Sequence, residues 1–282
     1  MSGPGDPSGQ AFFPGDARTP EPRVLLVDDD AYMRRLMSAR LAHLGAQVET
    51  APGAPAALSF LESHRPDLIV LDAVMPGMDG FDLCRRLKGD PLLQSIPVVI
   101  LTAVARDLRQ RSLAAGADDY LSKLDQDVLF RLRFRLAYRL ALRLAGGADD
   151  PPVTAPATLL AVSASRAVPA QLGTHLLPVA VQVDEAATLD EALARLQGWK
   201  PDLLALDLAL GPDHLDGWLA QLRSLPHGAD LPVLALATKG EEPWLAGLEP
   251  LIQDRLLKPL DGHESRHRVR HLLRVARVQE AC

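Results

Sequence analysis

The sequence predicts an α/β protein made of two tandem doubly wound parallel-sheet domains, each with five strand-helix units. Short apolar segments alternate with amphipathic segments through both halves of the chain, as in parallel strands that helices cover on both faces. Sequence landmarks also recur at one constant separation of 135 residues, which indicates a duplicated domain rather than a short solenoid repeat.

The landmarks lie at corresponding points of the two halves. They are Pro66-Asp67-Leu68 with Pro201-Asp202-Leu203, Leu71-Asp72 with Leu206-Asp207, Pro97-Val98 with Pro232-Val233, and Leu121 and Lys123 with Leu256 and Lys258. Gly- and Pro-rich breaks mark the boundaries. We predict a flexible leader at 1–22, a first domain at 23–145, a linker at 146–156, a second domain at 157–276 and a C-terminal tail at 277–282.

The strands and helices of the first copy can be predicted in chain order. Runs rich in Val, Ile and Leu predict strands, and apolar residues at helical spacing, with Gly45 after the first such segment, predict helices. The predicted strands are 24–27, 47–50, 68–71, 98–101 and 120–122, and the predicted helices are 32–44, 54–63, 81–88, 106–115 and 127–144.

Composition limits the function. The chain has 282 residues, a net charge of −6 and 23% charged residues, which is typical of a globular protein and gives no reason to expect nucleic-acid binding. The two cysteines favour a reducing compartment, so a cytoplasmic location is expected. There is no long uncharged apolar segment, and we expect no membrane span.

Polar side chains follow four of the predicted strands of the first copy. Asp28 and Asp29 follow the first strand, Asp72 the third, Thr102 ends the fourth and Lys123 follows the fifth. Ligands bind beyond the carboxyl ends of strands in such folds. Three clustered carboxylates without His or Cys favour Mg²⁺. With the metal bound, one carboxylate could attack a phosphoryl group, which the Lys123 ammonium and the Thr102 hydroxyl would bind.

These residues resemble the receiver (CheY-like) domain of bacterial two-component response regulators, a flavodoxin-like fold. The motifs that carry the resemblance are Val27-Asp28-Asp29, Leu71-Asp72 with Met75-Pro76-Gly77-Met78-Asp79-Gly80, Leu101-Thr102-Ala103 and Gly116 to Lys123. The resemblance implies that Asp72 accepts a phosphoryl group from a histidine kinase or phosphotransfer protein. It also implies that Asp28, Asp29, Asp72 and the Val74 carbonyl hold Mg²⁺, that Thr102 and Lys123 sense the phosphoryl group, and that Tyr120 is an aromatic switch.

The first copy departs from the family pattern at one position, and two further residues bear on the lifetime of the phosphoryl group. Leu124 stands where a cis-proline usually follows the lysine, and a cis bond before Leu costs about 2.5–4 kcal/mol. The residues two positions after Asp72 and Thr102 are Val74 and Val104, which cannot hydrogen-bond a hydrolytic water. We therefore expect slow self-dephosphorylation, on the order of hours.

The second copy keeps only part of the site. At the same offset, Ser163 and Ala164 replace the acidic pair and Ala237 replaces the threonine, while Asp207 and Lys258 remain. With so little negative charge we expect no Mg²⁺ site. We expect Asp207 to pair with Lys258 in an inactive adaptor or dimerisation domain. From the position of Gly217 relative to Gly80 we also expect two extra residues in the loop after Asp207.

Simpler structural roles compete with several of these assignments. Asp29 or Asp30 could be an ordinary helix cap. The arginines at 131, 133, 135, 139 and 143 alternate with apolar residues and favour a helix with an interface-facing side, by the resemblance a homodimer face, rather than nucleic-acid binding. His263 and His267 are expected to be exposed helix residues and not a metal pair.

Three functions remain open. The first is a stand-alone signalling adaptor. The second is a regulatory fragment of a longer diguanylate cyclase, because the order of receiver, degenerate receiver and basic helix resembles the front half of such enzymes, although no Gly-Gly-Asp/Glu-Glu-Phe motif is present. The third is a phosphohydrolase with an Asp nucleophile, which Val74 disfavours because such enzymes carry a second Asp at that position. The prediction is therefore a non-enzymatic regulator.

Overall fold

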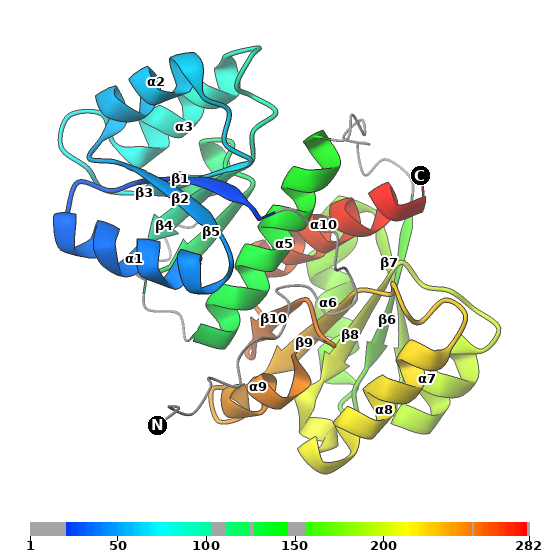
Figure 1. Ribbon diagram of the computed structural model, residues 1–282. Helices are drawn as coiled ribbons and strands as arrows, with labels where there is room; N and C mark the ends of the chain where they lie inside the picture. Colours follow the sequence, from blue (N-terminus) through cyan, green and yellow to red (C-terminus); the bar gives the residue numbers. More distant parts are fainter. Residues whose placement is uncertain (1–20, 103–110, 124–126, 146–155, 250, 281–282) are drawn as a thin grey trace, which may run out of the picture. The chain divides into compact units, whose positions relative to one another are not determined.

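Two separate five-stranded parallel sheets form the framework of the chain. The computed structural model describes residues 21–102, 111–123, 127–145, 156–249 and 251–280. The strand orders are β2-β1-β3-β4-β5 and β7-β6-β8-β9-β10, one sheet in each half of the sequence (Figure 1). Every strand pair with a described register is parallel. The predicted fold class of two tandem flavodoxin-like domains is confirmed.

The elements of the first copy agree with the predicted ranges to within two residues wherever they are described. They are β1 (Arg23–Val27), α1 (Ala31–His43), β2 (Gln47–Ala51), α2 (Ala54–Ser63), β3 (Leu68–Asp72), α3 (Gly80–Gly89), β4 (Val98–Thr102), β5 (Asp119–Ser122) and α5 (Asp127–Ala145). Helix α1 lies on one face of the first sheet, and α2 and α3 lie on the other (Figure 1). The predicted leader to residue 20, the first part of the helix at 106–115 and the linker at 146–155 lie outside the described residues.

The second copy repeats the same order of elements. It contains β6 (Ala157–Val162), α6 (Ala167–Leu176), η1 (Leu177–Val179), β7 (Val181–Ala186), α7 (Leu189–Leu196), β8 (Leu203–Asp207), η2 (Leu208–Leu210), α8 (Pro212–Ser224), β9 (Val233–Ala237), η3 (Glu242–Trp244), α9 (Leu245–Leu248), β10 (Asp254–Leu257) and α10 (Gly262–Glu280).

The two faces of the second sheet have separate apolar cores. Residues at 160, 162, 204 and 206 pack with those of α7 and α8, and their neighbours at 159, 161, 203 and 205 pack with those of α6 and α10. This alternation follows from the two-residue period of a strand. Both cores need apolar residues, which explains why the central strands are apolar throughout.

The duplication extends to individual polar contacts. Asp67, just before β3, accepts a hydrogen bond from the backbone N–H of Arg23 at the start of β1 (2.8 Å). Asp202, just before β8, accepts one from the backbone N–H of Thr158 in β6 (2.7 Å). Both carboxylates therefore tie the first strand of their sheet to the third.

Helix α5 packs within the second compact unit, although by sequence it closes the first copy. In the described chain, residues 21–102 and 111–120 form one unit, and the part from Leu121 onward forms the other. Leu132 belongs to the apolar core beneath α7 and α8, and Leu136 and Leu140 belong to the core beneath α6 and α10. The last helix of the first copy is thus part of the hydrophobic core of the second.

Three of the α5 arginines form ion pairs inside this unit. Arg131 lies 2.6 Å from Glu249, and Arg135 lies 3.4 Å from the same carboxylate. Arg133 contacts Asp254 at 3.3 Å, with both side chains buried. The sequence assigned this basic side to a homodimer interface, which is wrong for these three residues because acidic groups of their own chain neutralise them.

None of the described helices is both long enough and apolar enough to cross a membrane. The longest, α5 and α10, have 19 residues each and carry arginines along their length.

The buried α5 ion pair gives a stability prediction. Arg133→Met should lower the free energy of unfolding of the second unit by about 2 kcal/mol, because it removes a charged hydrogen-bond donor from the buried Asp254 carboxylate, near which Arg268 remains at 3.4 Å. Arg131→Met is the matched control, since the Arg131 side chain is 30% exposed and its loss should cost less than about 1 kcal/mol. Urea unfolding followed by tryptophan fluorescence measures this unit alone, because all three tryptophans lie in the second copy. Equal losses in the two variants would contradict the argument.

Candidate functional site

The carboxyl ends of three neighbouring strands of the first sheet carry buried polar side chains. Strands β1, β3 and β4 are adjacent in the sheet. Asp28 follows β1, Asp72 ends β3 and Thr102 ends β4, and all three are buried. Val27 is in register with Leu71, so the next residues, Asp28 and Asp72, leave the sheet side by side.

The structure brings the three predicted metal carboxylates together. Oxygen atoms of Asp28, Asp29 and Asp72 all lie within 4.8 Å of one another. The Asp28 and Asp72 side chains are 0% and 7% exposed, so their mutual repulsion is only weakly screened by water. A hard divalent cation would neutralise this charge, and an all-oxygen ligand set fits Mg²⁺.

The turn between β1 and α1 gives each of its acidic residues a separate role. An oxygen of Asp28 accepts a hydrogen bond from the backbone N–H of Asp30 (2.9 Å). Asp30 caps α1 by accepting from the N–H groups of Tyr32 (2.7 Å) and Met33 (3.1 Å). Asp29 is exposed. The alternative role as a helix cap therefore applies to Asp30 and not to Asp29.

Close packing fixes the backbone of Asp72. A Cβ atom at Gly80, the first residue of α3, would lie 2.0 Å from the Asp72 carbonyl oxygen. The Gly80 N–H donates to the carbonyl oxygen of Ala73 (3.2 Å). Val74, in the same loop, is 66% exposed. The absence of a side chain at Gly80 is thus required for α3 to begin against the loop that carries Asp72.

The remaining predicted residues lie on β5 and just after it. This edge strand is adjacent to β4. Tyr120 is 4% exposed within β5, and Lys123 is half-buried directly after the strand. Leu124 and Val104 lie outside the described residues. The roles of Thr102, Tyr120 and Lys123 as phosphoryl-sensing residues remain predictions.

The second copy forms a closed hydrogen-bonded cluster at the equivalent sheet edge. The Ser163 hydroxyl donates to one oxygen of Asp207 (2.7 Å), and the Lys258 ammonium donates to the other (2.5 Å). The Lys258–Pro259 peptide bond is cis. The expected ion pair between Asp207 and Lys258 is confirmed, and both carboxylate oxygens are engaged.

The expected insertion after Asp207 is wrong. Helix α8 begins at Pro212, five residues after Asp207, whereas α3 begins at Gly80, eight residues after Asp72. Gly217 lies inside α8 and would accept a Cβ without any contact within 4 Å. It is therefore not the counterpart of Gly80, because α8 starts earlier and without a glycine against the strand.

One acidic residue of the second site escaped the sequence analysis. Glu241 accepts a hydrogen bond from the backbone N–H of Thr238, just beyond β9 (2.7 Å), and the same oxygen lies 3.5 Å from the Lys258 ammonium. A Thr-x-x-Glu pattern, typical of a capping box, is visible in the sequence and could have indicated the first contact. The contact with Lys258 depends on the tertiary fold.

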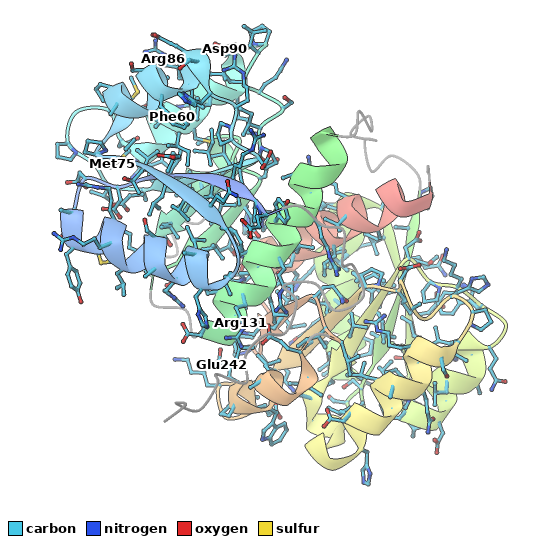
Figure 2. The ribbon with its side chains drawn as sticks, viewed as in Figure 1. Phe60, Met75, Arg86, Asp90, Arg131 and Glu242 are labelled. Atoms are coloured by element: carbon cyan, nitrogen blue, oxygen red, sulfur yellow. The ribbon has the colours of Figure 1, made fainter. Side chains whose placement is uncertain are left out.

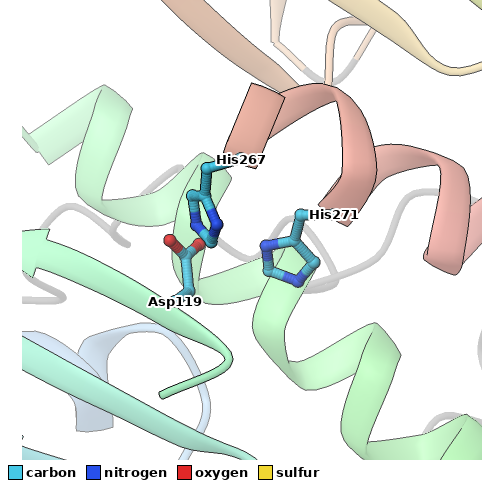
Figure 3. Close-up of side chains that lie close together, drawn as sticks. All are labelled: Asp119, His267 and His271. Atoms are coloured by element: carbon cyan, nitrogen blue, oxygen red, sulfur yellow. The ribbon is translucent and has the colours of Figure 1, made fainter. Parts of the chain in front are cut away.

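The histidines of α10 differ in burial. His263 is exposed, as expected, but His267 is half-buried and His271 is buried. The rings of His267 and His271, one turn apart, have centroids separated by 5.9 Å (Figure 3). The expectation that His267 is exposed is wrong because this residue lies at the margin of the buried face of α10.

Residues 24–132 match the response regulator receiver domain family. The first copy is therefore a receiver domain of the response regulator family, and the second five-stranded parallel sheet fits a tandem receiver domain.

Three similar proteins can be compared with this chain. The chain is 34% identical over 271 residues to the response regulator PleD of Caulobacter vibrioides, which covers 88% of this chain and 58% of PleD. It is 45% identical over 111 residues to an uncharacterised 14.6 kDa protein of Leptolyngbya boryana, covering 39% of this chain and 85% of that protein. A solved receiver domain of a signal transduction histidine kinase from Syntrophus aciditrophicus is 36% identical, with a TM-score of 0.39, over 46% of this chain and 94% of that one.

The contact between Gly80 and Asp72 gives a second prediction. Gly80→Ala should lower the free energy of unfolding of the first unit by about 3 kcal/mol, because the new methyl group overlaps the Asp72 carbonyl. Gly89→Ala, at the other end of α3, has no atom within 4 Å of the added Cβ and should be neutral or slightly stabilising. Urea unfolding followed by circular dichroism compares the two variants. A similar stability for both would show that α3 can shift without cost.

Proposed function

We propose that this protein is a response regulator that accepts a phosphoryl group on Asp72 from the phosphohistidine of a histidine kinase or phosphotransfer protein. The observation that carries the proposal is the cluster of Asp28, Asp29 and Asp72 at the carboxyl edge of the first sheet, with their oxygens within 4.8 Å of one another. If the chain acts alone, its output would be a change, caused by phosphorylation, in the surface with which it contacts another protein.

The proposed chemistry is the transfer of a phosphoryl group from a histidine side chain to Asp72. An oxygen of Asp72 attacks phosphorus, the bond from phosphorus to the histidine nitrogen breaks, and the electron pair of that bond returns to the imidazole. Asp28, Asp29, Asp72 and the Val74 carbonyl would hold Mg²⁺, which would supply the positive charge that lets a carboxylate approach the phosphoryl oxygens. Lys123 and Thr102 bind those oxygens afterwards, and the movement of Thr102 allows Tyr120 to change rotamer.

Exposed apolar side chains next to the site suggest where the phosphodonor protein docks. Tyr32 is 72% exposed and Leu36, one turn further along α1, is 40% exposed. Val74, two residues after Asp72, is 66% exposed. Large apolar side chains in contact with water are suited to a transient protein interface. A donor that covers α1 would bring its phosphohistidine to Asp72.

The second receiver is proposed to be an inactive adaptor. Its aspartate is already bound by Ser163 and Lys258, and it lacks the acidic pair. A homodimer through the last strand and helices of a receiver domain remains a prediction, and its interface would need surfaces other than the paired arginines of α5. These ion pairs also agree with the proposed absence of nucleic-acid binding. We propose a cytoplasmic location because the chain has only two cysteines, which favours a reducing compartment.

The main alternative is that this chain is the regulatory part of a longer diguanylate cyclase. The observation in its favour is the similarity to PleD along 88% of this chain, which spans 58% of that relative. The cyclase motif is absent from these 282 residues. An Asp-nucleophile phosphohydrolase is less well supported, because Val74 stands where such enzymes carry a second aspartate. We therefore propose that this chain catalyses only its own phosphorylation and dephosphorylation.

A phosphorylation experiment tests the central proposal. Incubation with Mg²⁺ and acetyl phosphate should add one phosphoryl group to the wild type and to Asp207→Asn, and none to Asp72→Asn, as measured by intact-mass spectrometry. Chelation of Mg²⁺ should abolish the adduct. An adduct that persists in Asp72→Asn and vanishes in Asp207→Asn would reverse the assignment of the active and inactive domains.

The lifetime of the adduct is a separate prediction. After the phosphodonor is removed, the phosphorylated protein should lose its phosphoryl group with a half-life on the order of hours, because Val74 and Val104 cannot position a water. Val74→Asn should shorten the half-life, since an amide can hydrogen-bond the attacking water. A wild-type half-life of seconds would contradict this reasoning.

The proposed docking surface can be separated from the chemistry. Tyr32→Ser should slow phosphotransfer from a phosphohistidine protein roughly tenfold and leave phosphorylation by acetyl phosphate unchanged. Leu177→Ser, in the second copy, is the matched control because Leu177 is 76% exposed and far along the sequence from Asp72. Equal rates with the protein donor for Tyr32→Ser and wild type would place the docking surface elsewhere.

A further inference from the structure

The inactive site of the second receiver contains a carboxylate that the first receiver lacks in sequence. At the offset of 135 residues, Glu241 corresponds to Arg106. Glu241 Oε2 accepts the Thr238 N–H at 2.7 Å and lies 3.5 Å from Lys258 Nζ. The Glu241 and Lys258 side chains are 14% and 17% exposed. An acidic group thus reaches the lysine of the site from the loop after β9.

The position of this carboxylate matches the place proposed for a phosphoryl group. In the first receiver, that group would lie between Asp72, the end of β4 and Lys123. In the second, the Glu241 carboxylate lies between Lys258, which also binds Asp207, and the backbone N–H that directly follows β9. The Glu241 carboxylate thus connects the Lys258 ammonium to the loop after β9. In the first receiver, a phosphoryl group would connect Lys123 to the end of β4 in the same way.

A neighbouring ion pair fixes the same loop to the sheet. Glu242, the next residue, lies 2.6 Å from Arg255 of β10, and both side chains are largely buried. Figure 2 labels Glu242 near the start of α9 and Arg131 on α5. Two successive glutamates therefore hold the segment between β9 and α9. Glu242 ties it to Arg255 of β10, and Glu241 ties it to Lys258, which directly follows β10.

This segment leads directly to the surface that binds α5. Glu249 follows α9 and pairs with both Arg131 and Arg135 (2.6 and 3.4 Å). Burial lowers the pKa of Arg135, and the nearby Glu249 carboxylate opposes that shift. Glu249 directly follows the four-residue helix α9, and the loop that Glu241 and Glu242 anchor directly precedes that helix.

We propose that Glu241 is a built-in substitute for a phosphoryl group, which holds the second receiver permanently in its anion-bound conformation. The surface formed by α9, β10 and α10 is then a docking site for α5 that needs no phosphorylation. The equivalence to a phosphoryl group rests on the proposed function of the first receiver. The dependence of α5 docking on Glu241 does not, because it concerns the second unit alone.

A purely local role for Glu241 makes a different prediction. As the glutamate of a capping box, three residues after Thr238, it would only stabilise the turn that begins at Thr238. Loss of the Lys258 side chain would then leave the stability of the turn unchanged. Loss of the cap would leave the packing of α5 unchanged. The two roles therefore differ in their dependence on Lys258 and in how far the effect extends.

Hydrogen–deuterium exchange without any phosphodonor distinguishes these roles. The peptides of interest cover residues 238–249 and 128–141, and the proteins are wild type, Glu241→Gln, Lys258→Met and the double variant. Glu185→Gln is the matched control, because it makes the same change at an exposed position on β7. Both single variants should exchange roughly tenfold faster than wild type in both peptides, as expected for the loss of a charged hydrogen bond. The double variant should be no faster than Lys258→Met, which already removes the contacts of the ammonium with both Asp207 and Glu241.

Each other outcome overturns the proposal. Faster exchange in 238–249 alone, with Lys258→Met unchanged, would leave Glu241 as a capping residue. Wild-type exchange in Glu241→Gln would show that the carboxylate is dispensable. Unfolding is detected independently by tryptophan fluorescence. If Glu241→Gln unfolds the unit, Glu241→Asp, which keeps the charge but shortens the reach, should reproduce the faster exchange in both peptides, and wild-type exchange in that variant would contradict the proposal.

Discussion

The burial of the central strands on both faces is the constraint on which the rest of the structure depends. Residues of β3, β4, β8 and β9 are buried throughout, so a polar side chain within them would be desolvated without a partner. Polar residues can lie only where the strands end. Because the strands are parallel, their carboxyl ends meet at one edge, and the chemistry-bearing residues of each copy collect there.

The two copies show how one frame accommodates opposite charge arrangements. The first places three carboxylates together, an arrangement that favours a divalent cation. The second replaces two of them with Ser163 and Ala164 and brings in Glu241, so that Lys258 contacts two carboxylates instead. A site that needs an external cation and anion has become one in which every charge is supplied by the chain. Such a site suits an adaptor better than a switch.

Helix α5 links these two halves in a way that the duplication alone does not require. Its leucines complete both cores of the second unit, and its arginines pair with acidic residues around β10. The buried Asp254 carboxylate lies near both Arg133 of α5 and Arg268 of α10, so the packing of α5 is coupled to a buried ionic cluster. The last helix of the first receiver therefore packs on the second. The proposed role of Glu241 makes this packing depend also on the inactive site.

The sequence by itself determined the duplicated α/β fold, the element boundaries in the described part of the first copy and the edge that carries the site, because strand and helix periods and a constant offset are local or repetitive signals. It also predicted the ion pair of Asp207 with Lys258, which follows from the alignment of the copies. Only the tertiary structure decided that Gly80 packs on the Asp72 backbone, that Gly217 does not play that role, that Glu241 reaches Lys258, and that the α5 arginines are neutralised within the chain. These contacts join residues distant in sequence or depend on where a helix begins, and no periodic pattern encodes such distances.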